Sequence, residues 1–476
     1  MKRRFVNLSI PVMFIALTAS ADEGMWLVNA IDRELYGRMR HAGLKLNPEQ
    51  IYGGTSSLAD AVVAVDGGMG TGSMVSADGL MVTNHHVAYG DICNLGDEEH
   101  DYLEEGFWAS SRSDELPVEG KSVWFLREVV DVTDKALEIR NEMERNGRWG
   151  PMGNRRIYAR LEKLYSQRSG LEASCVSMWG GRRYLLYLYE VYRDVRLVAA
   201  PPVRIGAFGG NDDNWNWPQH KGDFAFYRVY CSADGRPSEY SPDNVPLHPR
   251  RWLELSDKGV HEGDFTMVVG YPGRTHRYMS SAAIVEKQSV RNPVVVEARH
   301  ARMEVIDEAM RADPTVRRAY SDRYFNLSNN ADHALWENIC LGRFGVAELR
   351  HDEERRMAAW IDADTLRRTE YGNLPEMLEH AYAARREAVR YRSWFQEAWL
   401  SPSEALLAAN RVASVIRRLE RDGVEAIDTA DRRTRGLVAG LARLRRNYDR
   451  DTDRRLFVRS VPMFTSNVPR DMLRGT

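Results

Sequence analysis

The sequence has few cysteines and no long apolar run. Its four cysteines, Cys93, Cys175, Cys231 and Cys340, are widely spaced and form no C-x-x-C pair, so neither a zinc cage nor a redox motif is indicated. They allow one or two disulfides, and the sequence leaves the pairing open. No apolar stretch reaches about 18 residues, so no membrane-spanning helix is indicated.

An excess of charge of one sign is also missing. The formal net charge is -2 over 476 residues, which gives no reason to expect a nucleic acid as partner. The hydrophobic fraction of 43% is that of a globular protein, and the length is sufficient for two or three domains.

The first 21 residues have the three parts of a secretory signal peptide. A basic start, "MKRRF", precedes the apolar run "LSIPVMFIALT" and the small-residue site "ASA" at Ala19 to Ala21. We therefore predict cleavage before Asp22 and a periplasmic or otherwise exported protein. The alternative is a buried N-terminal helix.

The pattern of apolar residues divides the chain into a strand-rich part and a helical part. Strands are predicted within 61–65, 80–83, 182–206, 223–231 and 264–273, and two helices at 134–147 and 155–170. From about 277 to the end the spacing is helical throughout. We predict an α+β protein with a β domain at 22–276 and a helical domain at 277–476.

The stretch "TNHHVAYG", from Thr83 to Gly90, places two histidines where a predicted strand ends. Adjacent residues at a strand end point to opposite faces, and no H-E-x-x-H motif is present, so a shared metal ion is disfavoured. A general base is the preferred interpretation, and it needs a carboxylate to orient the imidazole. Asp223, before an alternating aromatic strand, is the candidate, although a simple turn residue would look the same.

Four motifs in order carry a resemblance to a known family. They are "DEGMW" from Asp22, "TNHHVAYG", "GGNDDNWNWPQHKGDFAFYR" from Gly209 and "GDFTMVVGYPGRTHRY" from Gly263. Together they resemble the bacterial dipeptidyl-peptidase 7 and 11 family, serine exopeptidases of the chymotrypsin clan. The resemblance implies a chymotrypsin-like double β-barrel with an inserted α-helical cap domain.

The resemblance also implies roles for individual residues. His86 matches the family's general base and Asp223 the carboxylate that orients it. Asn214 and Trp215 match a pair that binds the free amino terminus of the peptide. This is chemically reasonable, because an ammonium group needs acceptors and a π face, which an amide oxygen and an indole supply.

The sequence departs from the family pattern at three places. Met69 and Val87 stand where cysteines are common, so a disulfide beside the histidine is absent. A second amine-binding asparagine of the family aligns with Ala334, with Asn329 or Asn330 as possible substitutes. No G-N-S-G, G-D-S-G or G-x-S-x-G motif for a nucleophilic serine occurs anywhere.

The resulting expectation is an exported serine-type dipeptidyl aminopeptidase that acts on oligopeptides without metal or cofactor. The family suggests a homodimer. Because the serine motif is missing, the sequence is expected to be truncated before the nucleophile, with the second barrel incomplete and activity of this chain alone in doubt. One alternative is a catalytically dead or peptide-binding remnant. A weaker alternative is a metal-dependent hydrolase that uses His85, His86 and Asp223.

Overall fold

The structure is a computed structural model. It describes residues 25–473 except 55, 98, 151, 211–213, 274–275, 423–431 and 447. The signal peptide predicted for residues 1–21 lies outside the described residues.

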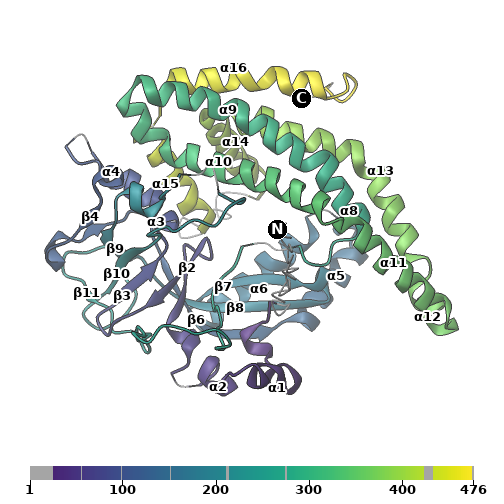
Figure 1. Cartoon of the computed structure of the whole chain (residues 1–476), viewed down its shortest axis with the longest axis horizontal. Coiled ribbons are helices and arrows are strands. Elements are labelled where there is room, and N and C mark those ends of the chain that lie inside the picture. Colours follow the sequence, from purple (N-terminus) through teal and green to yellow (C-terminus); the bar gives the residue numbers. More distant parts are fainter. Residues whose placement is uncertain are drawn as a thin grey trace, which may run out of the picture.

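An antiparallel sheet of eleven strands forms one half of the molecule (Figure 1). Its strand order is β4-β9-β10-β3-β2-β1-β6-β8-β7, and β11 and β5 pair with β10 and β9. The bounds are β1 Val62–Val65, β2 Gly70–Met74, β3 Leu80–Thr83, β4 Phe107–Trp108, β5 Leu116–Pro117, β6 Val123–Asp131, β7 Glu172–Met178, β8 Arg183–Tyr192, β9 Asp194–Ala200, β10 Ala225–Cys231 and β11 Val245–Pro246.

Seven helices accompany the strands within the described part of this half. They are α1 Arg33–His41, α2 Pro48–Ile51, α3 His85–Leu95, α4 Tyr102–Glu105, α5 Thr133–Arg145, α6 Gly153–Ser169 and α7 Val203–Gly206. Helix α3 packs on β3 and β10 and shares their apolar core, which includes Met81, Ile92 and Tyr227. Helices α5 and α6 cover β7 and β8 over a second core.

The described residues after 280 are almost entirely helical. The helices are α8 Ser281–Glu286, α9 Asn292–Ala312, α10 Pro314–Arg343, α11 Val346–Asp362, α12 Thr365–Tyr371, α13 Leu374–Trp394, α14 Glu404–Asp422, α15 Arg432–Arg446 and α16 Arg450–Asn467, with π-helical turns at Lys287–Arg291 and Phe395–Leu400. Helices α9 and α10 run side by side above the sheet, and α16 lies against α9 (Figure 1). No helix among the described residues is long and apolar enough to cross a membrane.

Helix α10 connects the helical half with the strand-rich half. Arg317 near its start pairs with Asp101 at 3.0 Å and with Glu104 at 2.7 Å, both at or beside α4. Further along, Phe325 stacks on Tyr89 of α3 with ring centroids 4.6 Å apart. Helix α10 therefore lies directly against the helix that begins with the two histidines.

The strand predicted at 264–273 is wrong, because this stretch forms no strand. Its apolar pattern is clear, yet Val268 is fully exposed. Leu255, Val260 and Tyr278, which lie nearby in the sequence, are also largely exposed. A strand requires a neighbouring strand to satisfy its backbone groups. The stretch instead meets the sheet through the Tyr271 amide, which donates to Thr71 Oγ1 at 2.8 Å, and the Tyr271 ring, which lies 6.2 Å from that of Tyr189 in β8.

The other predicted elements are confirmed with small shifts. The two early helices span 133–145 and 153–169, and the strands at 61–65, 80–83, 182–206 and 223–231 form as β1, β3, β8 with β9, and β10. All four cysteines are free thiols, so the disulfides that the sequence left open do not form.

Candidate active site

Strand pairing brings His86 and Asp223 together across 137 positions of sequence. Strands β3 and β10 are antiparallel neighbours, and Thr83 lies opposite Ala225. His86 follows β3 by three residues, and Asp223 precedes β10 by two. Both side chains therefore emerge at the same edge of the sheet, and His86 Nδ1 lies 2.8 Å from Asp223 Oδ2.

The carboxylate of Asp223 accepts three hydrogen bonds among the described residues. The backbone N–H of His86, in the first turn of α3, donates to Oδ1 at 3.0 Å. The ring Nδ1 of His86 and the side-chain amide of Asn84, 3.2 Å away, share Oδ2. First-turn amides of a helix have no partner within the helix, so α3 supplies a donor that fixes the carboxylate.

These contacts favour the ionised form of the Asp223 carboxylate. Burial alone would raise the pKa of Asp223, but the hydrogen bonds from the His86 ring and amide outweigh it and hold the pKa below its ordinary value. The carboxylate is thus ionised across the neutral range and fixes the proton of His86 on Nδ1. The His86 side chain is 54% exposed, and among the described residues Nε2 has no hydrogen-bond partner.

His85 has a different environment from His86. Its side chain is completely buried, its ring meets Tyr89 edge-on at 6.0 Å, and neither ring nitrogen has a partner at good hydrogen-bond geometry among the described residues. Burial lowers the pKa of His85, and the Asp223 carboxylate opposes this only in part. His85 is therefore a neutral packing residue.

Gly206, at the end of α7, leaves the space that the His85 ring fills. A Cβ at this position would lie 2.4 Å from His85 Cγ. We therefore expect Gly206→Ala to lower the free energy of unfolding by about 1–3 kcal/mol, as overpacked cores do. Urea denaturation would measure it. The matched control is Gly37→Ala, where nothing lies within 4 Å and α1 should be stabilised by roughly 0.5–1 kcal/mol. Equal effects would contradict the overpacking argument.

Asn214 and Trp215 meet Asn329 of α10. The side-chain amide of Asn214 donates to Asn329 Oδ1 at 3.0 Å, and the indole N–H of Trp215 donates to the same oxygen at 2.9 Å. Trp215 has a φ of +72°, a conformation rare for a side chain of this size. Its indole is also edge-on to His333, one turn further along α10, with ring centroids 4.5 Å apart.

The structure distinguishes between the asparagines that the sequence left open. Ala334 is buried in α10, and the side chain of Asn330 donates to the Asn326 carbonyl of its own helix. Asn329 alone of these three contacts Asn214 and Trp215. No sequence signal separates Asn329 from Asn330, because the choice depends on which face of α10 lies against the loop.

The remaining departures have visible consequences. Val87 fills the space beside Gly70, because a Cβ added at Gly70 would lie 2.7 Å from a methyl group of Val87. Met69 is exposed.

Among the described residues, no hydroxyl or thiol is hydrogen-bonded to His86. No group of three or more potential metal ligands is found among them either.

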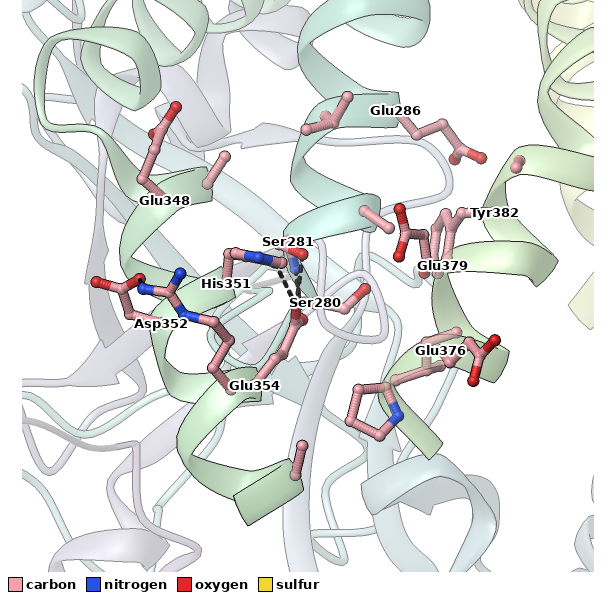
Figure 2. A pocket seen from close by; sticks show the side chains of 18 of the residues that line it. Ser280, Ser281, Glu286, Glu348, His351, Asp352, Glu354, Glu376, Glu379 and Tyr382 are labelled. Carbon is pink, nitrogen blue, oxygen red and sulfur yellow. Dashed lines mark hydrogen bonds and ion pairs between the residues drawn. The ribbon is translucent and has the colours of Figure 1, made fainter. Parts of the chain in front are cut away.

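A cavity of about 750 Å³ lies away from this pair, between α8, α11 and α13 (Figure 2). Acidic side chains line it, but several already have partners. Glu354 accepts bonds from the amide and hydroxyl of Ser281, and Glu286 pairs with Arg291 and Arg385. These contacts join the three helices to one another.

The structure thus belongs to the mixed α/β class, with a large antiparallel sheet and a histidine–aspartate pair at one edge of it. The chain belongs to the peptidase S46 family, whose model matches residues 21–474. It is 36% identical over 421 residues to dipeptidyl-peptidase 7 of Porphyromonas endodontalis, covering 87% of this chain and 51% of that protein.

Two further relatives give the same family. Dipeptidyl-peptidase 7 of Phocaeicola vulgatus is 33% identical over 488 aligned positions, covering 99% of this chain and 66% of the relative. The crystal structure of Porphyromonas endodontalis DPP11 with the dipeptide Arg-Glu matches with a TM-score of 0.78 at 30% identity, covering 94% of this chain and 64% of that one. The chain thus spans between half and two thirds of the length of these relatives.

Proposed function

We propose that this chain carries the acid–base and amine-binding parts of an exported serine-type dipeptidyl aminopeptidase. The observation that supports this most directly is the 2.8 Å contact between His86 Nδ1 and Asp223 Oδ2, with Nε2 left open. Membership of the peptidase S46 family and the names of the relatives agree with it.

In this proposal His86 acts as the general acid and base. Asp223 keeps the proton on Nδ1, so that Nε2 can accept the proton of an attacking hydroxyl group and later deliver it to the leaving amine. The ionised carboxylate also stabilises the imidazolium ion that forms between these two steps. The nucleophile would be a serine, and its motif does not occur in the 476 residues.

Asn214, Trp215 and Asn329 would bind the free amino terminus of an oligopeptide. The oxygen Asn329 Oδ1 accepts two hydrogen bonds, from Asn214 and Trp215, and so holds both side chains in place. With its amide nitrogen fixed in this way, Asn214 would present its own side-chain oxygen as the acceptor for an ammonium group. The exposed indole face offers a cation–π contact to the same group. A site built in this way would release dipeptides only from unblocked peptides.

The rest of the proposal follows the family. The strand-rich residues 22–276 would belong to a double β-barrel and residues 277–476 to a helical cap, in a periplasmic homodimer without metal or cofactor. A second candidate function is peptide binding without cleavage, which the same amine-binding contacts would support.

Binding of a dipeptide to the purified chain tests the amine-binding site without requiring catalysis. We expect a free dipeptide to bind and its N-acetylated form not to bind, as isothermal titration calorimetry would show. Asn329→Ala should weaken binding by a factor of about 10 to 100, because Asn214 and Trp215 lose the oxygen that holds both side chains in place for the charge-assisted hydrogen bond. Asn330→Ala is the matched control on the same helix, and it should change nothing. Equal binding of free and acetylated dipeptides would contradict the assignment.

A peptidase assay on the same preparation separates the two candidate functions. The chain as printed should not hydrolyse dipeptidyl fluorogenic substrates. A chimaera that continues it with the remaining length of the Phocaeicola vulgatus relative should hydrolyse them. Activity of the printed chain that is sensitive to a serine-directed inhibitor would show that a serine within it is the nucleophile. Binding without any hydrolysis by the chimaera would favour the peptide-binding function.

A further inference from the structure

A buried lysine lies beneath the helix that begins with the two histidines. Lys121 is in the loop before β6, and its side chain is only 3% exposed. Its Nζ lies 2.6 Å from Asp91 Oδ2 and 3.0 Å from Asp66 Oδ2. It also lies over the ring of Tyr227, 5.2 Å from the centroid.

The carboxylate of Asp91 connects helix α3 and strand β10, the two elements that position the proposed catalytic pair. Asp91 is on α3, five residues after His86, and Tyr227 is on β10, four residues after Asp223. The Tyr227 hydroxyl is fully buried and donates to Asp91 Oδ2 at 2.7 Å. This bond crosses directly from the helix of the histidine to the strand of the aspartate.

The ionisation states of Lys121 and Tyr227 agree with their contacts to the Asp91 carboxylate. Burial alone would lower the pKa of Lys121, but the carboxylates of Asp91 and Asp66 outweigh it and hold the pKa above its ordinary value. Burial, followed by the charge of Asp91, raises the pKa of Tyr227 well above its ordinary value. Lys121 is therefore a cation and Tyr227 a neutral donor, and Asp91 receives a hydrogen bond from each.

We propose that Asp91, Tyr227 and Lys121 are positioning residues that set the distance between His86 and Asp223. This inference rests on the proposed function. An apolar trio could fill the same core, but it would not fix α3 on β10 in one register. A hydrogen bond loses strength within a few tenths of an ångström and with modest tilt, so a small shift of α3 would separate Nδ1 from Oδ2.

The sequence offers a matched control on the same strand. Tyr230 is buried like Tyr227, and its hydroxyl donates to Glu115 Oε2 at 2.7 Å, beside the Glu115–Arg228 ion pair. Tyr227→Phe and Tyr230→Phe therefore remove the same group from the same strand, each from a buried carboxylate. Only the first of these carboxylates is on α3.

The test is the Nδ1 proton resonance of His86 in the purified chain labelled with ¹⁵N-histidine. A strong hydrogen bond to Asp223 shifts this proton far downfield, and Asp223→Asn identifies the signal by removing it. Tyr227→Phe should broaden the resonance or move it upfield, and Asp91→Asn should do the same. Tyr230→Phe should leave it in place. In the active chimaera, Tyr227→Phe should lower kcat roughly ten-fold to a hundred-fold with little change in KM, as expected for a misplaced base.

The outcomes separate this inference from the function on which it rests. If the unmodified chain shows no downfield proton that depends on Asp223, the pair does not form, and both the inference and the proposed function fail. If the proton is present but Tyr227→Phe and Tyr230→Phe affect it equally, the positioning role is overturned and the proposed function stands. Should Tyr227→Phe not fold, Asp91→Asn decides by the same resonance.

Discussion

Replacing Asp223 by asparagine is expected to lower kcat about 10⁴-fold in the chimaera that supplies the nucleophile. The side-chain amide of asparagine can donate to Nδ1 of His86, which would move the ring proton to Nε2. The nitrogen that must accept the proton of the nucleophile would then already be protonated. The amide also cannot balance the charge of the imidazolium ion, so both steps of the proton transfer are affected.

Steady-state kinetics on a fluorogenic dipeptide substrate measures this loss. His86→Ala should reduce kcat at least as strongly as Asp223→Asn, and the KM of both variants should stay near that of the unmodified chimaera. His85→Ala is the adjacent control, and it should retain more activity because His85 is buried away from solvent. If His85→Ala were the more damaging change, the roles of the two histidines would be reversed.

The sequence was sufficient to predict the pairing of His86 with Asp223, although 137 positions separate them. The motif carried that information, and strand register explains it, since residues just outside two paired strand ends must meet. The sequence did not show that the two histidines begin a helix. Asn84 occupies the N-cap position of α3, a signal for a helix start, but its side chain bonds Asp223 instead of an amide of α3.

Two other features depended on long-range contacts that local pattern does not contain. Asn329 and Asn330 are equivalent by composition, and only the docking of α10 on the β half selects the first. The stretch at 264–273 has the composition of a strand, but strand formation depends on pairing with a neighbouring strand, and among the described residues this stretch pairs with none.

Lys121 shows why the supporting residues of a site escape prediction. In "EGKSVWF" a single lysine before a strand reads as an exposed turn residue, because lysine is almost never fully buried unless it is paired. Its partners Asp66 and Asp91 are 55 and 30 positions away in the sequence. Nothing in the spacing of the three residues indicates that they share one buried contact.

Lys121→Met is expected to lower the free energy of unfolding by about 3 kcal/mol. Breaking a buried ion pair by removing one partner typically costs 3–5 kcal/mol, because the other charge is left without compensation. Here the carboxylates of Asp66 and Asp91 are 33% and 21% exposed, so solvent stabilises them in part, and the lower end of that range applies.

Urea denaturation of the purified chain at neutral pH measures this change, with Lys135→Met as the control. Lys135 pairs with Glu138 at 2.7 Å, but both side chains are about half exposed or more, so the loss of this pair should cost no more than about 0.5 kcal/mol.

The pH dependence of the stability provides an independent check. Because the pKa of Lys121 is raised in the folded state, its contribution is fully present below its unfolded pKa of about 10.4 and is lost as the pH rises through the folded value. The unmodified chain and Lys121→Met should therefore converge in stability only in strongly alkaline solution. Equal costs for the two lysine variants at neutral pH would show that the buried ammonium contributes no more than a surface one.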